Sequence, residues 1–203
     1  IPLYLRSLDS GISTKNYADA NQLLESIKGY QIKYASDIIP SDEKIHAEIM
    51  YNKYDIFRNL FMYYFLAGLL FFIFIILNIF SENKSIHNFM KYIFIIFRSS
   101  IVLLFIAHTL GLIARWYISG HAPWGDAYES MIYVAWATMG IGLLFIKKSD
   151  LTLASTSFVT SMILMIAHWN WMDPSIANLV PVLNSYWLMI HVSVIVGSYG
   201  PFA

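Results

Sequence analysis

Apolar residues are distributed unevenly along the chain, and they separate an amphipathic first part from a second part built of long apolar stretches. In residues 1–59, apolar positions such as Leu23, Leu24 and Ile27 recur at helical spacing, with charged residues on the other faces. After this part, uncharged stretches reach the length that a helix needs to cross a hydrocarbon layer of about 30 Å. The pattern predicts an all-α fold, a polytopic α-helical membrane protein with a small extracytoplasmic helical segment at its N-terminus.

Five membrane spans are predicted from the apolar stretches. They cover residues 60–80, 92–113, 128–146, 151–168 and 187–203. The fourth span is rich in Ser and Thr, which favours contact with other helices over exposure to lipid. The fifth span is too short to cross the bilayer before the sequence ends, so we expect more protein to follow it or to pack against it.

A second helix of the N-terminal segment is predicted to begin after Pro40. Ser41 is a suitable N-cap, and the acidic residues Asp42 and Glu43 favour the first helical turn. We expect this helix to run without interruption into the first span. The segment is too small to bury a large core by itself, so we expect it to dock on another surface.

Composition supports a membrane domain and excludes several other classes of protein. Hydrophobic residues make up 58% of the chain and charged residues 13%, and 15 of the 26 charged side chains lie in residues 1–59. The net charge is zero, so no basic surface indicates a nucleic-acid partner. The lack of cysteine excludes a disulfide scaffold, a Cys-ligated metal site and a thiol nucleophile. Because the chain starts at Ile1 without an initiator Met, we expect it to be a piece of a longer protein.

Basic residues in the short loops predict the orientation of the spans. The loops 81–91 and 147–150 carry four lysines, whereas the opposite loops, 114–127 and 169–185, carry only Arg115. Short cytoplasmic loops are enriched in Lys and Arg. We therefore expect the N-terminal segment and the loops 114–127 and 169–185 to lie on the periplasmic side of an inner membrane.

Histidine and tryptophan gather at this predicted outer face. The histidines at or near it are His108, His121, His168 and His191, and the tryptophans are Trp116, Trp124, Trp169, Trp171 and Trp187. Singly, each is explained as an interfacial polar residue or as part of an aromatic belt. Four histidines at one level favour a functional site, because ionisable groups in membrane segments are costly. Imidazole is a preferred axial ligand of haem iron, and a zinc ion bound by the same residues is an alternative.

The predicted outer loop between the second and third spans contains three charged residues of interest. Arg115 could bind a carboxylate such as a haem propionate through its planar guanidinium, or could extend to the interface from a helix end. Glu129 is explained by the positive end of the helix dipole of the third span, and Asp126 as the N-cap of that helix.

Two runs of sequence resemble the CcsA family of cytochrome c biogenesis proteins. The first is RWYISGHAPWGDAYES, preceded by AHTLGLIA, and the second is NLVPVLNSYWLMIHVSVIVGSYG. The second run is similar to a family segment in which a histidine follows P-x-L-x-S-x-W-L. Together with the spans between them, the two runs cover roughly residues 95–200. The preceding helical segment resembles the fused CcsBA form of the family.

The resemblance implies a component of a holocytochrome c synthase, an enzyme of the haem lyase type. Such a protein conveys haem b to an external pocket and attaches it covalently to the CxxCH thiols of apocytochrome c. The resemblance assigns His191 as an axial ligand of the haem iron, with His121, Arg115, Trp124 and Trp187 around the pocket. It implies three partners besides haem: apocytochrome c, a CcsB portion or subunit, and a C-terminal CcsA segment that carries the tryptophan-rich WWD motif.

One run resembles the WWD motif but is not identified with it. Residues 169–174, WNWMDP, are similar to its W-x-W-D-P core, yet they precede His191 and contain one extra residue. Three other interpretations stay open. The chain could be a haem-binding membrane anchor for electron transfer, a transporter fragment, or a structural piece that functions only with further segments.

Overall fold

The computed structural model describes the chain except for residues 37–38, 82–83, 170–171, 177–184 and 203. Regular structure in the described part is helical throughout, which confirms the all-α prediction. The chain divides into two compact units, Ile1–Ile45 and His46–Ala203. Among the described residues, three helical stretches are long and apolar enough to cross a membrane, namely Asp42–Phe80, Asn88–Ser119 and Asp150–His168.

The first unit contains a helical hairpin of α1 (Pro2–Thr14) and α2 (Ala18–Ala35). Helix α1 ends where Lys15 adopts the left-handed conformation, with a φ of 54°. Gly11 and Ala20 are the buried residues of these two helices. The small buried set agrees with the expectation that this segment forms no large core of its own.

The helix predicted after Pro40 is interrupted before it reaches the first span. Helix α3 (Asp42–Tyr54) is followed by Asp55, whose φ of 41° is left-handed, and α4 (Ile56–Phe80) begins directly afterwards. Asp is one of the few residues other than Gly that adopt this conformation readily. The prediction of an uninterrupted helix is therefore wrong, because Asp55 redirects the chain between the two helices.

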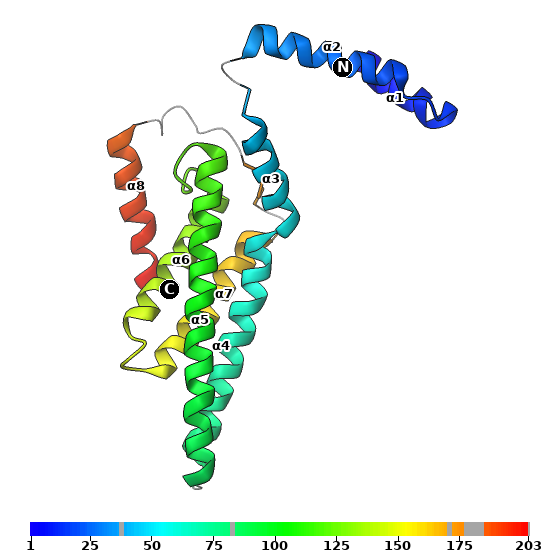
Figure 1. Ribbon diagram of the computed structural model, residues 1–203. Coiled ribbons are helices and arrows are strands. Elements are labelled where there is room, and N and C mark those ends of the chain that lie inside the picture. Colours follow the sequence, from blue (N-terminus) through cyan, green and yellow to red (C-terminus); the bar gives the residue numbers. More distant parts are fainter. Residues whose placement is uncertain (37–38, 82–83, 170–171, 177–184, 203) are drawn as a thin grey trace. The chain divides into compact units, whose positions relative to one another are not determined.

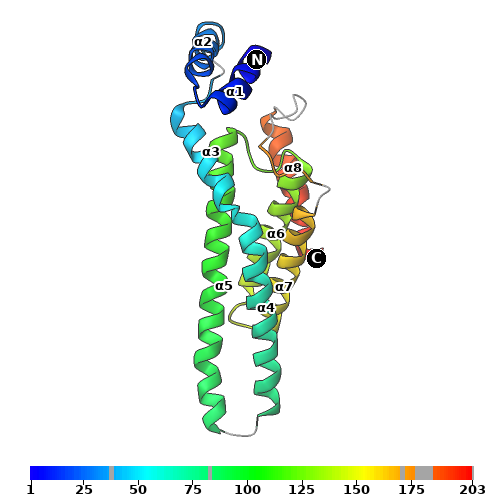
Figure 2. The ribbon, with the colours of Figure 1, turned by 90° about the vertical axis from the view of Figure 1, so that its right-hand side faces the viewer.

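The remaining helices of the second unit lie in the stretches predicted as the other spans; of these, Asn88–Ser119 and Asp150–His168 are long and apolar enough to cross a membrane. They are α5 (Lys84–Ser119), α6 (Ala127–Leu144), α7 (Asp150–His168) and α8 (Tyr186–Ser198), followed by a short 3-10 helix at Gly200–Phe202. Consecutive helices alternate in direction, so the loop after α5, the end of α7 and the start of α8 lie at one end of this unit (Figures 1 and 2). Helix α5, with 36 residues, extends beyond both ends of the span predicted for it. Helices α6 and α8 are shorter, with 18 and 13 residues.

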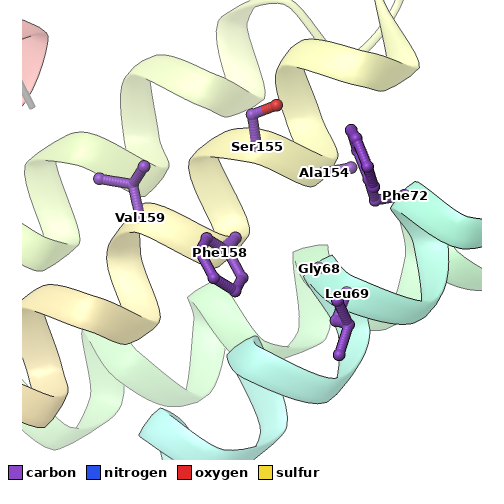
Figure 3. Close-up of a pocket in the computed structure, with 7 residues that line it drawn as sticks. All are labelled: Gly68, Leu69, Phe72, Ala154, Ser155, Phe158 and Val159. Carbon is purple, nitrogen blue, oxygen red and sulfur yellow. The ribbon is translucent and has the colours of Figure 1, made fainter.

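Helices α4 and α7 pack closely because small residues lie where they meet. A Cβ atom on Gly68 would lie 2.8 Å from the backbone nitrogen of Phe158. The Ser157 hydroxyl donates to the carbonyl of Tyr64 over 3.0 Å. Beside this contact lies an apolar cavity of about 290 Å³, in which Gly68 of α4 faces Ala154 and Phe158 of α7 (Figure 3). Burial of Ser157, Thr160 and Ser161 agrees with the prediction that the Ser and Thr content of α7 reflects helix contact.

At the opposite end of the second unit, an ion pair joins α5 to the start of α7. Arg98 donates from Nε and Nη2 to the two carboxylate oxygens of Asp150, over 2.6 and 2.8 Å. The hydroxyl of Ser149 caps α7 by accepting the backbone N–H of Thr152 over 3.2 Å. Both side chains of the ion pair remain partly exposed.

Candidate functional site

The loop between α5 and α6, residues 120–126, is fixed by hydrogen bonds at both ends. At its start, the Ser119 hydroxyl donates to the carbonyl of His121 over 2.9 Å. At its end, the Asp126 carboxylate accepts the backbone N–H of Glu129 over 2.7 Å, which confirms the predicted N-cap. Partial burial raises the pKa of the Asp126 carboxyl, and the hydrogen bond from Glu129 opposes this effect.

A completely buried ion pair lies behind this loop. Arg115, near the end of α5, donates from Nε to Oε1 of Glu129 in the first turn of α6 over 2.8 Å, and neither side chain is exposed. The second carboxylate oxygen of Glu129 accepts the backbone N–H of Gly125 over 2.7 Å. Nη1 and Nη2 of Arg115 donate to the carbonyls of Pro174 and Ser175, over 2.9 and 3.0 Å. One guanidinium therefore joins α5, α6 and the segment between α7 and α8.

Sequence reasoning missed this pair because it explained each member separately. It considered a haem carboxylate or the interface for Arg115 and the helix dipole for Glu129, whereas in the structure the carboxylate that Arg115 binds is Glu129. The available signal was the placement of opposite charges at facing ends of two consecutive apolar helices. A buried charge without a partner is so costly that such a pair is the expected arrangement.

Five aromatic side chains form a continuous row along α5, the loop and α6. Adjacent ring centroids in this row lie between 5.0 and 6.1 Å apart. The row runs through Phe105, Trp136, Tyr133, Trp124 and Trp116. An apolar cavity of about 140 Å³ opens beside it, and four of the five residues line that cavity. The row brings Trp124 next to α8.

Helix α8 carries two of the residues assigned by the sequence. Trp187 is 78% exposed, and His191 is exposed as well. Within the part of the chain that the structure describes, no side chain forms a hydrogen bond with the ring of His191. The indole N–H of Trp124 donates to the carbonyl of Met189 on the same helix over 3.2 Å. His191 is thus available to an external ligand, while the helix that carries it is anchored by Trp124.

His108 and His121 are both engaged by backbone carbonyls. His108 is completely buried, and its Nε2 lies 3.1 Å from the carbonyl oxygen of Ile132. The Nδ1 atom of His121 lies 3.2 Å from the carbonyl oxygen of Ala122. His108 therefore lies inside the helix bundle, and His121 helps to shape the loop.

His168 lies at the break between α3 and α4. Its Nδ1 is 3.1 Å from the carbonyl oxygen of Leu164, and its Nε2 is 3.4 Å from Oδ1 of Asp55. A cavity of about 370 Å³ adjoins this contact. The cavity is lined by Tyr51, Asn52, Asp55, Ile56, Phe57, Tyr128, His168, Asp173, Pro174 and Ser175. A hydrogen bond from the backbone N–H of Ser175 lowers the pKa of the Asp173 carboxyl on its rim.

The four outer histidines do not form one cluster among the described residues. His108 is in the bundle, His121 in the loop, His168 at Asp55 and His191 on α8. Among the described residues, no group of three or more His, Cys, Asp or Glu side chains could hold a metal ion, so the zinc alternative finds no set of ligands there. The WNWMDP run and the P-x-L-x-S-x-W-L segment lie partly outside the described residues, at 170–171 and 177–184.

Comparison with known proteins finds similarity to cytochrome c assembly and biogenesis proteins. Residues 124–203 match the model of a family described as cytochrome C assembly protein. Protein NrfI of Wolinella succinogenes is 39% identical over 195 residues, which cover 96% of this chain and 21% of that protein. A cytochrome c biogenesis protein CcsA of Prochlorococcus marinus is 33% identical over 146 residues, which cover 65% of this chain and 43% of that protein. The CcsA protein of Lotus japonicus is 32% identical over 115 residues, or 50% of this chain and 33% of that protein. The chain thus spans less than half of the length of each of these relatives.

Proposed function

Because the chain belongs to the CcsA family of cytochrome c biogenesis proteins, we propose that it takes part in attaching haem to cytochrome c. The proposed role is that of a component of a holocytochrome c synthase of the haem lyase type. Haem b is its substrate, and the CxxCH segment of apocytochrome c is the acceptor. The proposed setting is the inner membrane, with the N-terminal segment and the haem site on the periplasmic side.

The chemistry of attachment places few demands on the protein's own reactive groups. Each cysteine thiol of the acceptor adds across one haem vinyl group, so that a carbon–sulfur bond forms and the thiol hydrogen is transferred to the other vinyl carbon. Haem and acceptor therefore supply all the atoms that react. The task of this chain is to bind the iron and to hold the porphyrin in a fixed orientation, which is how a protein accelerates such a step.

We propose His191 as an axial ligand of the haem iron, and one contrast carries this assignment. His108, His121 and His168 each have a ring nitrogen within 3.2 Å of a backbone carbonyl oxygen. Among the described residues, the ring of His191 has no such partner and is exposed. A ring nitrogen with a free lone pair in an exposed position is what an iron ligand requires. The exposed indole of Trp187, one helical turn earlier, is suited to contact a flat porphyrin.

The other residues assigned to the pocket are proposed to act at its edge. Arg115 and His121 fix the outer loop through their hydrogen bonds, and Trp124 contacts α8. The proposed partners are a CcsB portion or subunit, a CcsA segment with the WWD motif, and apocytochrome c. The second axial ligand of the iron is expected from such a partner segment.

Replacing His191 with alanine is expected to weaken or shift the Soret band of the haem that copurifies with the intact protein in detergent. The reason is the loss of an axial nitrogen from the iron. The measurement is the visible absorption spectrum of oxidised and reduced protein, before and after addition of imidazole, which should restore the parent spectrum. His46→Ala is the matched control, because His46 is also exposed but lies on α3.

Three results would contradict the proposal in different ways. Haem that is present but spectrally unaffected by His191→Ala would remove the ligand assignment. Absence of haem from the parent protein in every oxidation state would remove haem handling, and would favour a transporter or structural role. Haem that is redox-active but never transferred to a CxxCH acceptor would favour an electron-transfer anchor.

A further inference from the structure

Helix α8 packs on the other helices of the second unit with little burial of its own. None of the residues from Tyr186 to Ser198 is buried. Two contacts with the aromatic row help to hold it: the indole N–H of Trp124 donates to the carbonyl of Met189, and Gly197 lies against Tyr133. Directly after the helix, Gly200 packs against the backbone of Thr138 on α6. The near absence of buried side chains means that the position of α8 depends strongly on these few contacts.

We propose that Trp124 is a positioning residue. It sets the position of α8 along its axis and the rotation of α8 about that axis, and it thereby presents His191 to the haem iron. This inference rests on the proposed function of His191. Trp124 does not need to touch haem in this role, because it acts through the backbone carbonyl of Met189. The role differs from that of a pocket wall, in which the ring face would be the important feature.

The geometry of a helix explains how one hydrogen bond can orient His191. His191 follows Met189 by two residues, so its side chain points about 200° around the helix axis and lies about 3 Å further along it. Met189 is half-buried and His191 is exposed, as this rotation requires. The N–H donor of Trp124 therefore fixes the inner face of the helix and leaves His191 on the outer face.

A second contact with the aromatic row constrains the direction of α8. A Cβ atom on Gly197 would lie 3.4 Å from the hydroxyl oxygen of Tyr133, which is ordinary van der Waals contact. Gly197 follows Met189 by eight residues, so it lies about 12 Å further along α8 and within about 80° of the same face. Two points so separated define the direction of the helix axis, and both are supplied by neighbouring rings of the aromatic row.

Trp124 is itself held in a fixed position, as a positioning residue must be. Its ring centroid lies 5.0 Å from that of Tyr133 and 6.1 Å from that of Trp116. The loop that carries it is fixed by the Ser119 and Asp126 hydrogen bonds. Ligands and their supports work only when neighbouring groups hold them to within about 0.5 Å of the productive geometry.

The test removes the N–H donor and keeps an aromatic ring. Trp124→Phe is compared with Trp116→Phe, a matched change in the same row at a ring for which the structure gives no hydrogen bond to α8. The intact, haem-loaded protein is titrated with free imidazole, which competes with His191 for the iron. Loss of one hydrogen bond of about 1 kcal/mol corresponds to roughly a five- to tenfold change in this competition. In the Trp124→Phe variant, we expect roughly five- to tenfold less imidazole to displace His191 from the iron. The Trp116→Phe variant should require the same imidazole concentration as the parent protein.

A second measurement reports on the helix without haem. Amide hydrogen exchange over residues 186–193 should accelerate in Trp124→Phe and remain unchanged in Trp116→Phe, because α8 is released from its anchor. If the phenylalanine variant fails to accumulate, β-(3-benzothienyl)alanine at position 124 keeps the shape of indole and removes only the N–H donor. It should give the same two shifts.

Failure of this inference and failure of the proposed function are distinguishable. If haem binding depends on His191 but neither Trp124 variant changes the titration or the exchange of α8, the positioning role is wrong and the ligand assignment stands. Equal effects of the Trp124 and Trp116 variants would likewise overturn it, since they would indicate general loosening of the aromatic row. If the haem spectrum does not depend on His191, both proposals fail.

Discussion

Replacing Arg115 with alanine is expected to lower the free energy of unfolding by about 3–5 kcal/mol. The change leaves the Glu129 carboxylate completely buried without its cation, and it leaves the carbonyls of Pro174 and Ser175 without their donor. A buried charge that loses its partner cannot regain hydration, so nearly the whole cost is felt in the folded state. The measurement is unfolding of the intact protein in mixed detergent micelles, followed by far-ultraviolet circular dichroism.

The same helix provides a matched control for this result. Arg98 also binds a carboxylate, that of Asp150, but its side chain is 39% exposed, so Arg98→Ala should cost only about 1 kcal/mol. The double change Arg115→Met with Glu129→Leu should recover part of the loss, because no charge is then left buried alone. Equal costs for Arg115→Ala and Arg98→Ala would contradict the view that Arg115 joins three segments of the site.

Replacing Gly68 with alanine is expected to destabilise the protein by about 1–3 kcal/mol, although alanine is the better helix former. The new Cβ atom would lie 2.8 Å from the Phe158 nitrogen and 3.0 Å from the Ala154 carbonyl oxygen. Both are backbone atoms of α7, so the contact is relieved only if the two helices move apart. The same unfolding titration measures the effect.

Gly140→Ala on α6 is the corresponding control. A Cβ atom there would meet only the ring of Phe105, at 3.5 Å, which is ordinary contact. This change should be neutral or should stabilise the protein by about 0.5–1 kcal/mol, the usual difference between Gly and Ala in a helix. If Gly68→Ala behaved in the same way, the close approach of α4 and α7 would not be a constraint on the fold.

The loss of stability expected for Arg115→Ala and the positioning role proposed for Trp124 concern the same part of the molecule. Arg115 fixes the segment at Pro174 and Ser175, which leads toward α8, and Trp124 fixes α8 itself. Neither role requires contact with haem. We expect variants at both positions to alter haem ligation, but only the Arg115 variant to lower global stability by several kcal/mol.

The sequence by itself indicated the membrane class, the approximate positions of most helices and the resemblance to a family. Long uncharged stretches have a direct physical meaning, since a helix of fixed rise must match the thickness of a hydrocarbon layer. The run around Arg115 and the run around His191 gave the resemblance that residues 124–203 support through the family model. The cap at Asp126 was also predictable, because capping depends on residues that are adjacent in the chain.

Only the tertiary structure decided which residues meet. The break at Asp55, the Arg115–Glu129 pair and the contact from Trp124 to Met189 depend on how separate helices pack. Each residue alone had an adequate local explanation, as a helix position, a dipole partner or an interfacial ring. Hydrogen bonds and ion pairs between distant segments depend on distances that no periodicity encodes. The resemblance of the sequence to a known family indicated His191 as a candidate ligand, whereas the contact of α8 with the aromatic row became apparent only in the structure.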